Sequence, residues 1–203
     1  MASPQALSEP DRRLLALWAA DCAERVLPLF EADAPDDDRA RDGIGRARRF
    51  GSGELDTAGE IRRRFEAGRA AQSAKAPAAV AAARAAGQAS GVAHMGAHAL
   101  GAAAYAAKAA ALAASDQEAA RRDEVRWQLG HMTADVRAAL LRLPALGENS
   151  AGPLGPGLLA SGVLATTILE IQAELSRGEV PVRDEAAGAT RHHESCLGPT
   201  INL

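Results

Sequence analysis

The sequence has few aromatic residues, and this scarcity limits how its core can be built. Aromatics make up 3% of the 203 residues, whereas alanine supplies about a quarter. A small side chain buries little apolar surface, which contributes about 25 cal/mol per Å². Alanine is also the best helix former, because it loses no side-chain entropy and buries no polar group. The composition therefore predicts alanine-faced helices that approach closely and gain stability from many dispersion contacts.

Cysteines and long hydrophobic runs are also scarce. The only two cysteines, Cys22 and Cys196, lie far apart and do not make a disulfide framework. Residues 1–10 are polar and lack the apolar region of a secretory signal. The most apolar stretch, residues 158–171, is about half the length that spans a bilayer. We therefore expect a cytoplasmic protein with no membrane segment.

Charge is nearly balanced overall but uneven along the chain. The net charge of −3 does not favour a nucleic-acid binder or a membrane-surface protein. Between residues 39 and 69, nine arginines and five acids leave a local charge of +4 (9 − 5). Such a segment fits ion-paired helix faces, a protein-facing patch or a phosphate-contacting surface, although few aromatics are interleaved for base stacking. The arginines are Arg39, Arg41, Arg46, Arg48, Arg49, Arg62, Arg63, Arg64 and Arg69.

Apolar periodicity predicts an all-α fold, a single compact alanine-rich helical bundle of six to eight helices over residues 1–178. Ser8 is the expected N-cap of the first helix. Pro28 should kink or end that helix, because proline removes a backbone donor and clashes with the preceding turn. The apolar stripe of this helix recurs every four residues, at Leu14, Trp18, Cys22 and Val26.

Capping signals and turn residues place the later helices. Thr57 and Ser115 each begin a capping box. Four glycines between residues 87 and 101 favour a close helix–helix contact within one long helix, with a break near Gly87 as the alternative. Residues 144–157 are rich in glycine and proline and predict a loop. Further helices are expected over residues 36–50, 57–69, 77–113, 115–127, 133–143 and 158–176, with a disordered tail over 179–203.

His94 and His98 are the best candidates for metal or ligand chemistry. Their spacing of four places both imidazoles on one helix face, where they could reach one metal. The zinc-protease pattern is missing, and so are the Glu-x-x-His pairs of helical di-iron sites. His131 and Glu66 are the remaining ligand types that the fold could bring near. We favour histidines that hydrogen-bond within or between helices, and we expect no metal and no cofactor.

Nothing in the sequence points to catalysis. Residues 192–196, His-His-Glu-Ser-Cys, hold several ligand types, but they lie in the expected tail. Nothing fixes a general base or an oxyanion donor beside Cys196. Cys22 lies on the apolar stripe of the first helix and is expected to be an inert core residue. No glycine-rich segment matches a phosphate-binding loop or a dinucleotide fingerprint.

Several blocks of the sequence resemble a family of small helical bacterial proteins. The most specific block runs from Leu17 to Glu31, in which Trp18, Asp21-Cys22 and Leu27-Pro28-Leu29-Phe30 keep the order and spacing of the family's opening helix. The resemblance extends over residues 14–130 and continues through residues 35–41, 47–53, 85–89, 93–106 and 124–128. This family is described as immunity proteins of bacterial polymorphic toxin systems, the immunity-protein-5-like family. After His131 the chain has no clear counterpart in it.

The resemblance implies an all-helical cytoplasmic protein without enzymatic activity that binds and neutralises a cognate bacterial toxin. Stoichiometric inhibition needs only a complementary surface with a few buried anchors and matched charge. The exposed candidates are Asp36, Asp37, Asp38 and the arginines after them. Two alternatives stay open at this point: a ligand- or metal-binding helical protein that uses His94 and His98, and a biosynthetic accessory protein with a separately processed C-terminal segment.

Overall fold

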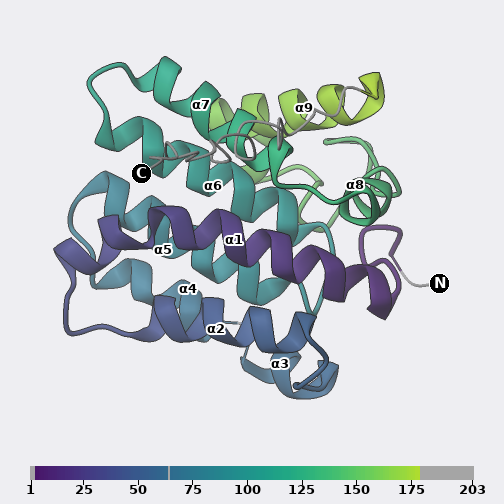
Figure 1. Ribbon diagram of the computed structural model, residues 1–203, viewed down its shortest axis with the longest axis horizontal. Coiled ribbons are helices and arrows are strands. Elements are labelled where there is room, and N and C mark those ends of the chain that lie inside the picture. The colour runs from purple at the N-terminus through teal and green to yellow at the C-terminus, as the bar shows by residue number, and fades with distance from the viewer. Residues whose placement is uncertain (1–2, 64, 179–203) are drawn as a thin grey trace, which may run out of the picture.

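The computed structural model describes residues 3–63 and 65–178 (Figure 1). Within these ranges every regular element is helical, which confirms the predicted all-α bundle. Eight α-helices have seven residues or more, and α4 is a single turn. No helix in the described part of the chain is long and apolar enough to cross a membrane. The expected tail over 179–203 lies outside the described residues.

The elements follow one another through short connections, except for a long loop before the last helix. They are α1 (Glu9–Asp33), α2 (Arg39–Gly51), α3 (Thr57–Arg63), α4 (Glu66–Arg69), the 3-10 turn η1 (Ala70–Gln72), α5 (Pro77–Gly91), α6 (His98–Ala113), α7 (Gln117–Gly130), α8 (Ala134–Leu140), the 3-10 turn η2 (Leu158–Ala160) and α9 (Gly162–Arg177).

The first helix begins as predicted but ends later. The Ser8 hydroxyl accepts the backbone N–H of Asp11, at 3.3 Å, and caps α1. The helix then passes through Pro28 and continues to Asp33, so the prediction that proline could end it is wrong. Proline removes one backbone hydrogen bond, but Leu27 and Phe30 are buried on either side of it. The burial of these large side chains offsets the loss.

Two predicted caps are each displaced by one position. Asp56, rather than Thr57, accepts the backbone N–H of Gly59 at 2.8 Å. Asp116, rather than Ser115, caps α7 by accepting a backbone N–H three residues on, at 3.0 Å. An aspartate carboxylate accepts hydrogen bonds without donating and carries a charge that the helix dipole favours, so it replaces the neighbouring hydroxyl.

The segment after Pro77 forms two helices instead of one. Gly87 lies inside α5, and the break comes at residues 92–97, between α5 and α6. The backbone N–H groups of Gly96 and Ala97 donate to carbonyls of the N-terminal segment, both at 3.1 Å. The break is therefore set by a segment distant in the sequence, which local pattern could not show.

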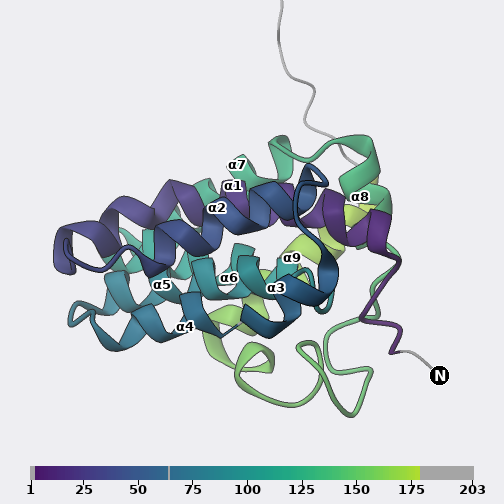
Figure 2. The same cartoon turned by 90° about the horizontal axis from the view of Figure 1, so that it is seen from below.

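The alanine-rich helices α5 and α6 form the centre of the bundle. They contact each other and both contact α1, while α7 and α9 contact α6. Figure 2 shows α1 and α2 in the upper half of the bundle, with α5 and α6 beneath them. Small side chains let these backbones approach closely, and the contact is maintained through many weak dispersion interactions. The buried alanines of α6 are Ala99, Ala102, Ala103, Ala104, Ala106, Ala107, Ala109 and Ala111.

The N-terminal segment and the last third of the chain are joined through one buried amide. Gln5 is 0% exposed. Its Nε2 donates to the carbonyl of Ala151 at 2.7 Å, and its Oε1 accepts the backbone N–H of Leu154 at 2.9 Å. The predicted loop over 144–157 is confirmed, and the first residues of the chain hold it in place. The helix after it ends at Gly178, as predicted, with a φ of +77°.

A buried arginine ties α2 to α3 and α4. The side chain of Arg46 is 0% exposed. Its guanidinium contacts Asp42 at 2.9 Å, Glu60 at 3.2 Å and Glu66 at 3.6 Å. A buried charge is tolerated only where opposite charges and hydrogen bonds surround it. This network positions the short helices that border the pocket described next.

Candidate functional site

A pocket of about 700 Å³ opens between α4, η1, α5 and α6. We call it the arginine–histidine pocket. Phe65, which is 60% exposed, contributes to its lining, and Gly68, Gly87 and Gly91 contribute backbone surface. Its polar side chains come from α4, η1, α5, α6 and the break between α5 and α6: Arg69, Gln72, Arg84, Gln88, His94, His98 and Tyr105.

Glycines make this pocket possible by letting its walls approach. A Cβ on Gly87 would lie 2.7 Å from the Cα of Gly68, so α5 and α4 meet backbone to backbone. A Cβ on Gly91 would lie 3.0 Å from the ring of His98. The prediction that the glycines mark a close helix contact is therefore confirmed for Gly87 and Gly91, whereas Gly96 lies in the break between α5 and α6.

Two of the polar groups in the pocket are oriented by neighbours. The Nδ1 of His98 lies 2.8 Å from the Oε1 of Gln88. The guanidinium of Arg84 lies over the ring of Tyr105, 5.8 Å from its centroid, and donates a long hydrogen bond to the phenol oxygen at 3.5 Å. Tyr105 is buried, at 2% exposed, so it provides a rigid support for the exposed arginine.

The structure brings His94 and His98 into this pocket but not the other candidate ligands. The prediction that both histidines share one helix face is wrong, because His94 lies in the break at residues 92–97 and only His98 lies on α6. Their ring centroids lie 6.5 Å apart. Glu66 pairs with Arg63 at 2.9 Å, and His131 lies on the far side of the bundle with its Nδ1 2.8 Å from the carbonyl of Trp127. Within residues 3–63 and 65–178, no three His, Cys, Asp or Glu residues gather in a way that could hold a metal ion. The histidine pair therefore gains no support as a metal centre.

A second feature lies between α1 and α7, on a different face. The guanidinium of Arg25 lies 4.0 Å from the ring centroid of Trp127, and that ring stacks on His131 with centroids 3.9 Å apart. We call these three residues the Trp127 stack. Arg25 also pairs with the buried carboxylate of Glu124 at 2.9 Å, which fixes the stack against the core. Such cation–π contacts contribute about 0.5–1 kcal/mol at exposed sites.

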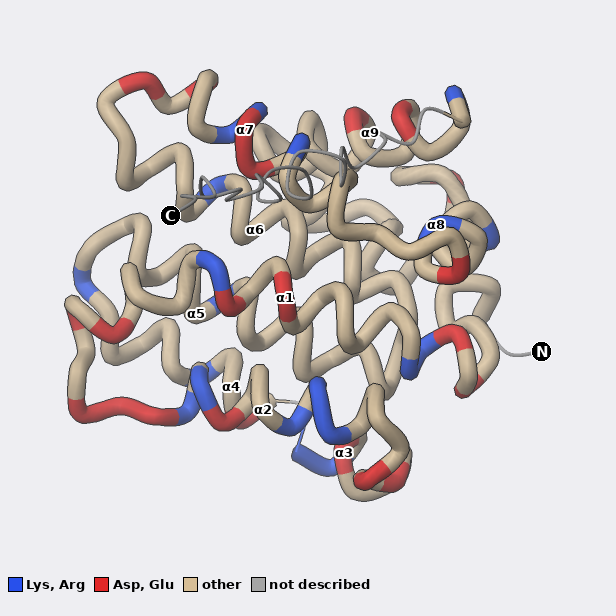
Figure 3. The backbone as a smooth tube through the Cα atoms, viewed as in Figure 1, with Lys and Arg blue, Asp and Glu red and all other residues tan. Residues whose placement is uncertain are grey.

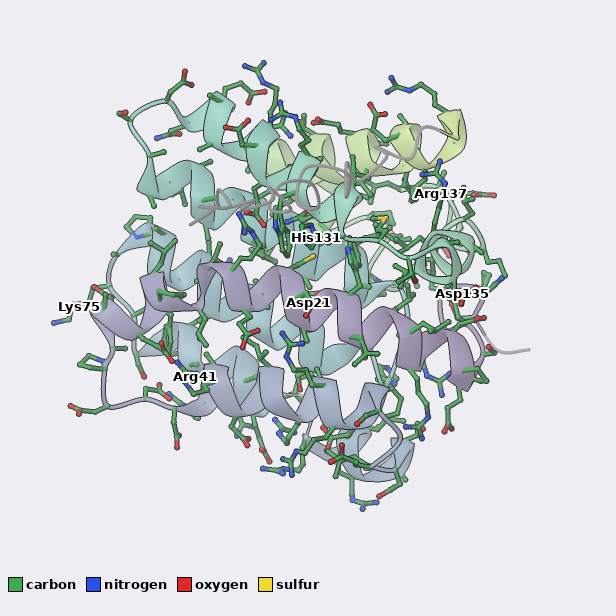
Figure 4. The ribbon with its side chains drawn as sticks, in the orientation of Figure 1. Asp21, Arg41, Lys75, His131, Asp135 and Arg137 are labelled. Atoms are coloured by element: carbon green, nitrogen blue, oxygen red, sulfur yellow. The ribbon has the colours of Figure 1, made fainter. Side chains whose placement is uncertain are left out.

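Charged side chains surround the Trp127 stack. A shallow hollow of about 360 Å³ is lined by the stack together with Asp21 and Glu24. Arg48 of α2 pairs with both of these acids, at 2.7 Å to Asp21. Figure 4 shows Asp21 on α1 below His131, with Arg41 farther along α2. The face therefore carries an aromatic centre with a charged rim.

The acidic loop, Asp36–Asp38, lies at the end of the bundle where α1 passes into α2. Figure 3 shows it as a continuous acidic stretch of the backbone. Asp36 and Asp38 are exposed. Asp37 instead accepts from the guanidinium and the backbone N–H of Arg39, and the guanidinium holds the pKa of this carboxyl well below its usual range. Of the three predicted binding acids, Asp37 is therefore engaged in holding the loop.

Most of the predicted arginine cluster is neutralised internally. Arg39, Arg41, Arg46, Arg48 and Arg63 each pair with at least one carboxylate. This pattern matches the ion-paired helix faces expected from the sequence. Among the described residues, the members of this cluster without a carboxylate within 4 Å are Arg49, Arg62 and Arg69.

Cys22 is 0% exposed, and burial raises the pKa of its thiol well above the ordinary value. This agrees with the expectation of an inert core residue, because the thiolate is the reactive form. The ligand-rich residues 192–196 lie outside the described part of the chain.

Sequence reasoning did not find the pairing of Arg84 with Tyr105 or that of Arg25 with Trp127. Each pair joins two different helices, so no spacing within one segment of the sequence could predict it. The i, i+4 spacing of Trp127 and His131 was the one available signal.

One comparison with known proteins gives a result. A family model described as "Imm-5 like putative immunity protein" matches residues 5–135. The match includes the arginine–histidine pocket, the Trp127 stack and the acidic loop. No curated protein and no solved structure matches the chain significantly.

Proposed function

The chain belongs to the Imm-5 like family of immunity proteins, and on this premise we propose that it binds and neutralises a cognate bacterial toxin without acting as an enzyme. The observation that carries the proposal is the family match over residues 5–135 of the 203-residue chain. An inhibitor of this kind works by occupying a surface of its toxin and needs no catalytic group.

We propose the Trp127 stack as the centre of the toxin-binding surface. Tryptophan and arginine dominate the binding energy of protein interfaces, because they bury large areas and keep a polar group for the partner. Arg25 is already held by Glu124 and Trp127, so binding orders few further side chains. Asp21 and Glu24 carry two negative charges against the one positive charge of Arg48, so the rim keeps a negative charge that selects a partner with a basic patch.

The acidic loop is the second element of the proposed surface. Asp36 and Asp38 are exposed, and their charge accelerates the approach of a basic toxin more than it strengthens the final complex. Their removal should therefore slow association and reduce its dependence on salt.

Co-expression with a bacterial toxin tests the function, and a toxin-domain protein encoded by a neighbouring gene is the first candidate. The wild-type chain should restore growth, and the purified pair should form a stable complex. Failure to protect, together with no complex by calorimetry, would contradict the proposal.

Substitutions test the proposed surface. His131→Ala and Arg25→Ala should each weaken toxin binding by about thirtyfold or more, the effect of a hot-spot residue. Arg126→Ala is the matched control, because Arg126 lies on α7, is 71% exposed and pairs only with Asp123. Equal binding by all three variants would show that the toxin binds elsewhere.

A further inference from the structure

The arginine–histidine pocket differs in charge from its surroundings. Among the described residues that line it are two arginines and two histidines but no carboxylate. Neither Arg69 nor Arg84 has a carboxylate within 4 Å in the described part of the chain, whereas five arginines of the neighbouring cluster do. A concave surface lined by one sign of charge concentrates ligands of the opposite sign.

We propose that this pocket binds a small organic anion that carries a phosphate or carboxylate group. A guanidinium presents paired donors that match the oxygens of either group. Arg84, supported by Tyr105, and Arg69 approach the same space from α5 and α4. The anion accepts hydrogen bonds from these two side chains, and the imidazoles of His94 and His98 complete the polar lining.

The size of the pocket favours a whole small molecule over an isolated ion. Its volume of about 700 Å³ lies within the range of about 300–1,000 Å³ that is usual for ligand pockets. A Cβ on Gly68 would meet no atom within 4 Å, so this glycine leaves open space at the wall formed by α4. Phe65, exposed at 60%, offers an apolar surface for the uncharged part of the ligand. A molecule about the size of a mononucleotide matches this space.

The pocket is built in advance of binding. Arg84 lies against the buried Tyr105, and the Nδ1 of His98 is fixed by Gln88. Arg46, buried beneath α4, holds that helix through Glu66. Groups already held in place lose little conformational entropy when a ligand binds. This inference does not depend on the proposed toxin, and the chain alone is sufficient to test it.

Calorimetric titration of the full chain with inorganic pyrophosphate, AMP and citrate, at about 0.15 M ionic strength, tests the proposal. At least one of the three should bind saturably in a 1:1 ratio. Arg84→Gln and Arg69→Gln should each weaken that binding about tenfold or more, the effect of losing a charge-assisted hydrogen bond. Arg62→Gln is the matched control, since Arg62 is exposed, has no carboxylate partner among the described residues and lies outside the pocket. It should leave binding unchanged.

Two outcomes would overturn the proposal. No saturable binding of any of the three probes is the first. An equal loss in the Arg62→Gln variant is the second, because it would indicate attraction by net charge alone. Melting curves of all variants confirm that each is folded.

Discussion

The centre of the bundle and its last helix fill the core in opposite ways. The α5–α6 pair buries alanines and glycines, so its backbones lie close together. α9, which lies beyond the family match and contacts α6, buries branched side chains, namely Leu164, Ile168, Ile171 and Leu175. The alanine-rich centre gains stability from close approach, and α9 gains it from buried area. The segment without a family counterpart is therefore part of the same core.

Of the changes considered, removing α9 should destabilise the fold the most. A chain that ends at Pro144 exposes the face of α6 that α9 covers and leaves Arg121 without Glu170, to which it is bonded at 2.6 Å. We expect loss of cooperative thermal unfolding, measured by circular dichroism. A chain that ends at Gly178 is the control and should keep its melting temperature, because the sequence predicts an unstructured tail beyond it. A cooperative transition in the shorter chain would show that α9 is dispensable.

Truncating one large side chain in α9 should lower the free energy of unfolding more than truncating one small side chain in α6. Ile168→Ala leaves a cavity and should cost about 2–5 kcal/mol. Ala104→Gly, equally buried in α6, should cost about 2 kcal/mol from helix propensity and one lost methyl group. Urea unfolding at equilibrium measures both. If Ile168→Ala and Ala104→Gly lower the free energy of unfolding equally, close packing of the α5–α6 backbones stabilises the protein more than its buried area predicts.

Adding a methyl group should separate close packing from helix propensity. Gly87→Ala places a Cβ 2.7 Å from the Cα of Gly68, and overpacking of this kind costs about 1–3 kcal/mol. Gly45→Ala lies in α2 with no atom within 4 Å of the new Cβ, so it should stabilise the protein by up to about 1 kcal/mol. The opposite signs should appear as opposite shifts in melting temperature. Stabilisation by both substitutions would contradict a close contact between α4 and α5.

The smallest effect on stability is expected in the acidic loop, which belongs neither to the α5–α6 pair nor to α9. Because the pKa of Asp37 is lowered by Arg39 in the folded state, its contribution to stability is complete above its unfolded pKa of about 3.9. That contribution decreases as pH falls through the lower folded value. Asp37→Asn should therefore flatten the fall in stability below about pH 4, measured by urea unfolding at several pH values. Asp36→Asn, exposed in the same loop, should leave the curve unchanged.

Helix positions were largely predictable from the sequence, and their junctions were not. The apolar stripe of α1 and the stop at Gly178 follow from local periodicity and backbone preference. The passage of α1 through Pro28 depends on burial of Leu27 and Phe30, which a local rule does not include. The break at 92–97 depends on backbone hydrogen bonds from distant residues. His94 and His98 were found from their spacing, but Arg84 and Tyr105 join them only in the folded chain.

The alanine-rich helical bundle, the places of most helices and the resemblance to immunity proteins can all be inferred from the sequence alone. These follow from propensity, periodicity and motif order, which act over a few residues at a time. The folded chain was needed to show that Gln5 holds the loop before α9, that Arg25 stacks on Trp127 and that one pocket is lined by two arginines with no carboxylate partner among the described residues. Each of these contacts joins residues distant in the chain, so its energy depends on how whole helices pack together.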